Sequence, residues 1–175
     1  MAEYLKTRID GRGVVLQFAA LPFRIASGAV EILLITSRET QRWIIPKGWP
    51  IRGLRPRDVA AREAFEEAGL VGTIVGKRSV GSYHYTKRLP ENQEILCRVK
   101  VFLLSVDHQL DTWKEKEQRE SEWMTPQKAA RLIDDRGLAE VFRTTLPTIQ
   151  SLSAKEDKGT ASRGDPTPAN DESRN

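Results

Sequence analysis

The sequence predicts an α/β domain, because strand-like stretches lie on both sides of one well-marked helix. Residues 13–23 and 29–36 are rich in Val, Ile, Leu and Phe and are separated by turn residues, as expected for two consecutive strands. Residues 56–68 predict a helix: Pro56 suits a first turn, several alanines favour helical backbone, and Gly69 stands where helices commonly end.

The second half of the chain adds further elements of both kinds. Residues 73–85 and 96–106 predict two more strands, joined by a connection over residues 87–92. Residues 126–134 and 138–145 show the spacing of apolar residues that predicts helices.

The C-terminal segment differs in composition from the rest of the chain. From residue 153 onward apolar residues almost vanish, and Ser, Asp, Glu, Lys, Gly and Pro dominate. We therefore expect one domain over residues 1–152 and a disordered tail over residues 153–175. The tail has four basic and five acidic residues, a net charge of −1, so the overall charge of +4 leaves +5 on the domain.

Length and composition are those of a single enzyme-sized domain. The 175 residues are enough for one sizeable core, and 39% hydrophobic content is ordinary. No apolar run approaches the ~20 residues that span a bilayer, and the first residues lack a signal-peptide pattern, so we expect no membrane partner and a cytoplasmic location. Cys97 is the single cysteine, and a buried strand thiol is the expectation for it.

Three carboxylates share one side of the expected helix. At about 100° per residue, Glu63, Glu66 and Glu67 fall within an arc of about 100°. The opposite side carries Ala61, Ala64, Phe65 and Ala68. Like charges at this spacing destabilise a helix by a few tenths of a kcal/mol per pair, which a bound cation would offset. Oxygen ligands suit Mg²⁺ or Mn²⁺; a plain solvated face, with Arg62 paired to Glu66, is the alternative interpretation.

The pattern around these glutamates resembles the signature of the Nudix hydrolases. Gly48 is followed by thirteen residues and then by Arg62-Glu63-Ala64-x-Glu66-Glu67-x-Gly69-Leu70. The family usually has a glutamate six residues after the first glycine, where this chain has Leu54, so the number of metal ions stays open. The resemblance implies an α/β/α sandwich around a mixed sheet and hydrolysis of a phosphoanhydride bond.

Flanking motifs narrow the resemblance to one subfamily. Ser37-Arg38, Trp43-Ile44-Ile45-Pro46-Lys47-Gly48, Glu91-Asn92-Gln93-Glu94, Trp113 and Glu122-Trp123 are similar to motifs of the diphosphoinositol polyphosphate phosphohydrolases and their bacterial relatives. These enzymes also cleave diadenosine polyphosphates, and the match covers roughly residues 12 to 135. A polyphosphorylated small molecule is the implied substrate.

The resemblance also implies roles for the residues of the helix. Glu63 and Glu67 would ligate the metal, and the main-chain carbonyl of Gly48 or Lys47 would add an oxygen. Glu66 is our first choice for the residue that activates water, and Glu63 is the rival.

Two other positions complete the expected catalytic set. Arg62 is interpreted as orienting a neighbouring glutamate. Glu122 is a candidate extra metal ligand or alternative base, with Glu120 as its nearest competitor.

The basic excess, with a sequence pI of 9.3, fits a polyanionic ligand. The cations are scattered and accompany no stacking-aromatic motif for RNA and no known DNA-reading helix, which argues against nucleic acid. Comparison with the subfamily favours Arg38 and Arg119 as phosphate contacts. The remaining candidates are Ser37 beside Arg38, Lys47 in the basic run before the helix, and the pair Lys87 and Arg88, which chemistry alone suggests.

Three alternatives remain beside this prediction. The same reaction could serve nucleotide-pool cleansing or removal of an RNA 5′ pyrophosphate. Leu54 also permits a non-catalytic Nudix module that senses a phosphorylated ligand. The third alternative is a nucleic-acid-binding protein.

Overall fold

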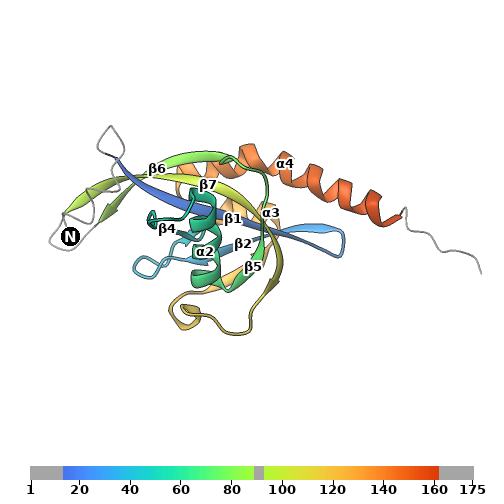
Figure 1. Cartoon of the computed structure of the whole chain (residues 1–175), viewed down its shortest axis with the longest axis horizontal. Coiled ribbons are helices and arrows are strands. Elements are labelled where there is room, and N and C mark those ends of the chain that lie inside the picture. Colours follow the sequence, from blue (N-terminus) through green and yellow to red (C-terminus); the bar gives the residue numbers. More distant parts are fainter. Residues whose placement is uncertain (1–13, 89–92, 162–175) are drawn as a thin grey trace, which may run out of the picture.

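A mixed β-sheet with helices on both faces forms the part of the chain that the computed structural model describes, residues 14–88 and 93–161 (Figure 1). The strands are β1 (Val15–Ala26), β2 (Ala29–Thr36), β3 (Trp43–Ile44), β4 (Lys47–Gly48), β5 (Leu70–Ile74), β6 (Gly81–Arg88), β7 (Glu94–Gln109) and β8 (Ser121–Met124). The helices are α2 (Pro56–Ala68), α3 (Pro126–Leu132) and α4 (Arg136–Ala161), with a short 3₁₀ turn, η2 (Lys116–Gln118). In the described ranges, no helix is long and apolar enough to cross a membrane.

The sheet is mixed because its two longest strands run parallel. β1 and β7 pair in parallel from Val15↔Cys97 to Phe23↔Ser105, and the other pairings are antiparallel. The main strand order is β3-β2-β1-β7-β5, with β4 on β1, β6 on β7 and β8 on β2. This order brings the short β4, just before α2, onto the middle of β1.

Successive strand residues point to opposite faces of the sheet, and each face packs into its own hydrophobic core. The face under α2 contains Phe18, Ala20, Leu33, Ile35, Phe102 and Leu104 of the strands, packed on Val59, Ala60, Ala64 and Ala68. The opposite face contains Ala19, Leu21, Ile32, Leu34, Val101 and Leu103, packed on Ala129, Leu138, Phe142 and Ile149 of α3 and α4. The implied α/β/α sandwich with a mixed sheet is therefore confirmed.

Helix α2 has the bounds that the sequence predicts. Arg55, before it, has extended backbone, and Pro56 starts the first turn without needing a hydrogen-bond acceptor for an N–H. Gly69 ends the helix with φ 66°, and its N–H donates to the Phe65 carbonyl at 2.9 Å. Local signals and tertiary packing agree here.

The single strand predicted over residues 73–85 is wrong. The chain forms β5 and β6 instead, separated by a turn in which Gly76 has φ 77°. Backbone in the left-handed region cannot continue a strand. The exposed Lys77 and Arg78 that follow also do not fit the alternating burial of a strand packed on one face.

Helix α4 is longer than predicted. It begins at Arg136 and continues through Pro147 to Ala161, because Ile149 is fully buried and Ser153 is only 8% exposed. The expected start of the tail at residue 153 thus lies inside a helix, and residues 162–175 lie outside the described residues.

Candidate active site

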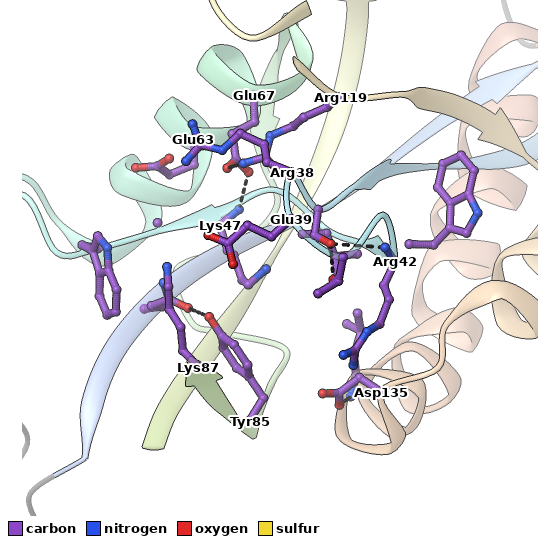
Figure 2. A pocket seen from close by; sticks show the side chains of 18 of the residues that line it. Arg38, Glu39, Arg42, Lys47, Glu63, Glu67, Tyr85, Lys87, Arg119 and Asp135 are labelled. Atoms are coloured by element: carbon purple, nitrogen blue, oxygen red, sulfur yellow. Dashed lines mark hydrogen bonds and ion pairs between the residues drawn. The ribbon is translucent and has the colours of Figure 1, made fainter. Parts of the chain in front are cut away.

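Helix α2 carries its three glutamates at the edge of its buried face, beside β4. Val59, Ala60, Ala64 and Ala68 anchor the helix on the sheet, which fixes the direction of the carboxylates that alternate with them. Glu67 is buried, Glu63 is half-buried, and Glu66 is partly exposed. The close-up view shows Glu67 pointing from α2 toward Lys47 and Arg119 (Figure 2).

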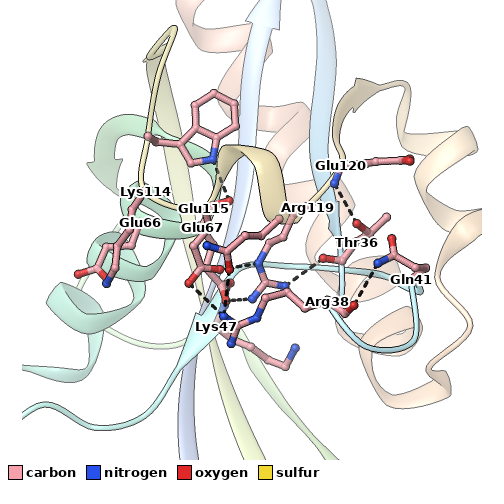
Figure 3. A network of polar contacts seen from close by, with 12 residues as sticks. Thr36, Arg38, Gln41, Lys47, Glu66, Glu67, Lys114, Glu115, Arg119 and Glu120 are labelled. Carbon is pink, nitrogen blue, oxygen red and sulfur yellow. Dashed lines mark hydrogen bonds and ion pairs between the residues drawn. The ribbon is translucent and has the colours of Figure 1, made fainter.

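Glu67 lies in a buried ion-pair network with Arg119 (Figure 3). Oε2 of Glu67 accepts from the main-chain N–H of Lys47 at 3.0 Å, and Oε1 accepts from Nη2 of Arg119. Arg119 also donates Nε to Glu115 at 2.8 Å and Nη1 to the Thr36 carbonyl at 3.0 Å. The side chains of Arg119 and Glu67 are only 7% and 9% exposed. Burial raises the pKa of Glu67, and the Arg119 charge opposes that rise.

Glu63 rests directly on Gly48. A β-carbon on Gly48 would come within 2.1 Å of the Glu63 carboxyl carbon, so only glycine leaves room for this carboxylate against β4. Burial raises the pKa of Glu63 to about 7, and the nearby charges of Glu67 and Glu66 add to the rise. Within the described residues, Glu63 has no hydrogen-bond or ion-pair partner.

Glu66 is held by two cations. Arg62 donates Nε to Oε1 at 2.7 Å, as the i, i+4 spacing predicts, and Lys114 donates Nζ to Oε2 at 2.6 Å. The hydrogen bonds from Lys114 and Arg62 lower the pKa of Glu66.

A cavity of about 720 Å³ opens next to these glutamates. Across it from α2 lie cations of β4 and β6: burial in the cavity lowers the pKa of Lys47 to about 8, and Lys87 lies 5.0 Å from the centre of the Trp49 ring. Tyr85 donates its hydroxyl to Gln17 at 2.7 Å on the same wall (Figure 2).

Most of the candidate residues from the sequence line this one cavity. They are Ser37, Arg38, Lys47, Gly48, Arg62, Glu63, Glu66, Glu67, Lys87, Arg88 and Arg119. Trp49 lines it too. Lys87 and Arg88 lie at the end of strand β6, where the sequence predicted a connection between strands.

Glu122 does not line this cavity, and its expected role at the metal stays a prediction. Its neighbour Trp123 packs on the α2 face of the sheet, so Glu122 points to the other face, where it pairs with Lys128 of α3. Glu120 is also absent from the cavity wall, and its side chain points away from Glu67 in Figure 3.

Two charged residues just before the 3₁₀ turn, Lys114 and Glu115, contact site residues although the sequence did not predict this. Glu115 contacts Arg119, and Lys114 contacts Glu66. The one signal for them is the spacing of Glu115 and Arg119, four residues apart in a segment that the subfamily motif at Trp113 already marks.

The donor set suits a hard divalent cation, although Glu66 and Glu67 have cationic partners here. In the described part of the chain, no group of three or more His, Cys, Asp or Glu side chains is gathered so that it could hold a metal. Glu67 turns to Arg119 and Glu66 to Arg62 and Lys114. Glu63, the second oxygen of Glu67 and the carbonyls of β4 are all-oxygen ligands of the kind that Mg²⁺ and Mn²⁺ prefer. A metal that binds Glu67 through Oε1 has to displace the Arg119 guanidinium.

Comparison with known proteins gives the family. The NUDIX domain model matches residues 16–145, and the chain belongs to this family. The chain is 32% identical to the Arabidopsis thaliana protein "Nudix hydrolase 16, mitochondrial" over 103 residues, 57% of this chain and 56% of that relative, so it spans little more than half of it. It is 30% identical to the Bos taurus diphosphoinositol polyphosphate phosphohydrolase 3-beta over 126 residues, 71% of this chain and 72% of the relative.

Solved structures with low identity share the fold. A Caenorhabditis elegans Ap4A hydrolase in a binary complex has a TM-score of 0.60 at 19% identity, covering 79% of this chain and 99% of that one. The NUDIX domain of Shewanella oneidensis NrtR, complexed with ADP ribose, has a TM-score of 0.61 at 13% identity, covering 85% and 97%. The predicted family is thus confirmed, and relatives named as phosphohydrolases support the predicted pyrophosphohydrolase. Nudix hydrolases generally use divalent metal ions. The cytoplasmic location stays a prediction.

Proposed function

We propose that this chain hydrolyses a phosphoanhydride bond in a polyphosphorylated small molecule, with Mg²⁺ or Mn²⁺ as cofactor. One observation carries the proposal: a single cavity has the glutamates of α2 on one wall and the cations of β4, β6 and the loop after β2 on the other. Carboxylates alone would repel a phosphate chain, and cations alone would bind it without activating water. Both kinds of group are needed for hydrolysis.

The charges of the cavity wall explain why a divalent cation is needed. Its seven basic residues are Arg38, Arg42, Lys47, Arg62, Lys87, Arg88 and Arg119, and its eight acidic residues are Glu39, Glu63, Glu66, Glu67, Glu94, Glu115, Asp134 and Asp135. With every one of these groups ionised, the wall has a formal charge of −1, which disfavours a polyanion. A divalent cation on the glutamates reverses that sign.

Glu63 and Glu67, with the carbonyl of Gly48 or Lys47, would hold the metal. When bound, the ion neutralises phosphate charge and lowers the pKa of water. The protein itself orients the carboxylates: Gly48 leaves room for Glu63, and the N–H of Lys47 fixes Oε2 of Glu67.

The basic side chains that substrate phosphates would contact differ in how firmly other protein groups already hold them. Arg38 is 56% exposed and makes only a 3.7 Å ion pair and a 3.2 Å hydrogen bond, so it can turn to a ligand. Lys47, with a pKa of about 8, is largely protonated at neutral pH. Arg119 already makes three contacts with protein groups, so its first role is to hold Glu67, and a phosphate contact requires it to leave one of these partners.

The contacts of Glu66 with Arg62 and Lys114 bear on which glutamate activates water. Glu66 is a weak base while Arg62 and Lys114 hold it, because both lower its pKa. Glu63, with a raised pKa and no partner in the described residues, is the stronger base of the two before metal binds. Glu66 keeps its proposed role only if substrate draws one of its cations away.

Diphosphoinositol polyphosphates and diadenosine polyphosphates are the substrates that we propose first. They carry enough phosphates to reach cations on several walls, and relatives and structural neighbours are named for them. Leu54 is 39% exposed and does not line the cavity, so this departure from the family pattern leaves the acidic wall intact.

The test is phosphate release from a substrate panel of diphosphoinositol polyphosphates, diadenosine tetraphosphate, 5′-triphosphorylated RNA and ATP. We expect the highest specificity constants for the first two classes. Arg38→Ala should lower them roughly tenfold or more, and should affect ATP less, because ATP reaches fewer cations. Arg131→Ala, on the α3 helix, is the matched control and should change nothing. Preference for ATP or RNA would move the assignment to nucleotide cleansing or RNA processing, and binding without release would indicate a ligand-sensing module.

A further inference from the structure

A second cavity, of about 570 Å³, lies at the start of α2. Its wall consists of Arg55, Pro56, Arg57, Lys77, Arg78, Ser79, Lys100 and Phe102, and none of these residues lines the first cavity. Six residues separate Arg57 from Glu63, which places them about 120° apart around the helix axis. The two cavities therefore face different sides of α2.

The second cavity concentrates positive charge. Five of its eight wall residues are basic and none is acidic. They come from three parts of the fold: the start of α2, the turn between β5 and β6, and the middle of β7. The turn exists because the chain forms two strands where one was predicted, so the sequence alone did not bring Lys77 and Arg78 next to Arg55 and Arg57.

Most of this charge is not neutralised by the protein. Among residues 14–88 and 93–161, Asp58 is the one carboxylate in contact with the cluster; it accepts from Arg55 at 2.6 Å and lies 3.8 Å from Arg57. The side chains of Lys77, Arg78 and Lys100 make no hydrogen bond or ion pair with any other described residue. Five cations against one carboxylate leave four positive charges around one hollow, and their mutual repulsion favours an anionic ligand.

We propose that this cavity binds a small molecule with several phosphoryl groups, at a site separate from catalysis. Arg and Lys on three sides of a hollow match clustered phosphate oxygens, which accept charge-assisted hydrogen bonds from several directions. A nucleic-acid strand fits less well, because stacking of bases needs exposed aromatic rings and the one aromatic residue of the wall, Phe102, is only 4% exposed.

Binding of inorganic tripolyphosphate to the full chain in the presence of chelator tests the proposal independently of hydrolysis. Amide NMR signals distinguish the two cavities: the second is reported by residues 77–79 and 100, and the first by Lys47 and Gly48. We expect a saturable shift at residues 77–79. The triple variant Lys77→Ser, Arg78→Ser, Lys100→Ser should weaken the binding affinity measured from this shift by about tenfold or more. The Lys47 and Gly48 signals should respond as in the wild type.

A matched triple variant on the other face of the sheet separates site binding from overall charge. This control removes three exposed cations of α3 and α4 through the substitutions Lys128→Ser, Arg131→Ser and Arg136→Ser. It should leave the binding affinity measured at residues 77–79 unchanged. Equal weakening by both triple variants, or shifts confined to the first cavity, would overturn the proposal. Tighter binding of a single-stranded RNA oligomer at residues 77–79 would replace the small molecule by nucleic acid. If the first triple variant does not fold, Lys77→Glu alone provides the same comparison.

Discussion

Replacing Arg119 by alanine is the most informative single change in the buried network. The guanidinium is the shared partner of Glu67, Glu115 and the Thr36 carbonyl, and its side chain is 7% exposed. Its removal leaves two carboxylates and a carbonyl without their donor in a place that water reaches poorly.

The expected loss of stability follows from that burial. Removing one partner of a buried ion pair destabilises a protein by about 3–5 kcal/mol, because the remaining charge is not compensated. For a chain of this length each kcal/mol lowers the melting temperature by about 2–4 °C. We therefore expect Arg119→Ala to melt roughly 6–20 °C below the wild type in chelator.

Thermal unfolding in chelator and in excess Mg²⁺ measures this effect. Arg143→Ala is the control, because Arg143 pairs with Glu140 on an exposed part of α4 and should leave the melting temperature nearly unchanged. Mg²⁺ should restore part of the stability of Arg119→Ala and should stabilise it more than the wild type, since the ion can take the place of the guanidinium at Glu67. An Arg119→Ala protein that melts within about 2 °C of the wild type in chelator would refute the reasoning.

Three further changes test the electrostatics of the site. Because the pKa of Glu63 is raised from 4.5 to about 7, the metal-free protein should lose stability as the pH rises between these values; Glu63→Gln should remove this loss, as urea unfolding at pH 5 and pH 8 would reveal. Because Lys47 loses its proton near pH 8, KM should rise above that pH, and Lys47→Arg should keep KM constant; a rise in both proteins would assign the effect to another group. Gly48→Ala should weaken Mn²⁺ binding measured by calorimetry, since its β-carbon displaces the Glu63 carboxylate, and unchanged affinity would contradict the proposal that Gly48 positions this carboxylate for the metal.

The helix of the carboxylates could be predicted from the sequence because its signals are local. Pro56, a run of alanines and Gly69 mark its ends and its buried side without reference to the rest of the fold. The strands β1 and β2 were found for the same reason, whereas β5 and β6 were merged. One glycine, Gly76, sets that turn, and its backbone angle is not evident from a stretch otherwise rich in strand-forming residues.

Residues that depend on strand orientation or on distant contacts were harder to predict. Glu122 lies in a strand of four residues, and which side of the sheet it faces depends on pairing with β2 and not on its own neighbours. Lys114 contacts Glu66 of α2 from 48 positions along the chain, and Glu115 contacts Arg119, the partner of Glu67, beside a turn that no periodic pattern marks. The residues of the cavity wall could be predicted singly, but their convergence required the fold.

Metal-dependent phosphate release from a diphosphoinositol polyphosphate is the most direct test of the proposed function. It should be measured with Mg²⁺ and with chelator in the wild type, Glu63→Gln and Arg131→Ala, the last as a control on α3. The proposed function predicts release that requires Mg²⁺, is unchanged in Arg131→Ala and falls by about a hundredfold or more in Glu63→Gln. Full release in chelator, or a fully active Glu63→Gln protein, would contradict it.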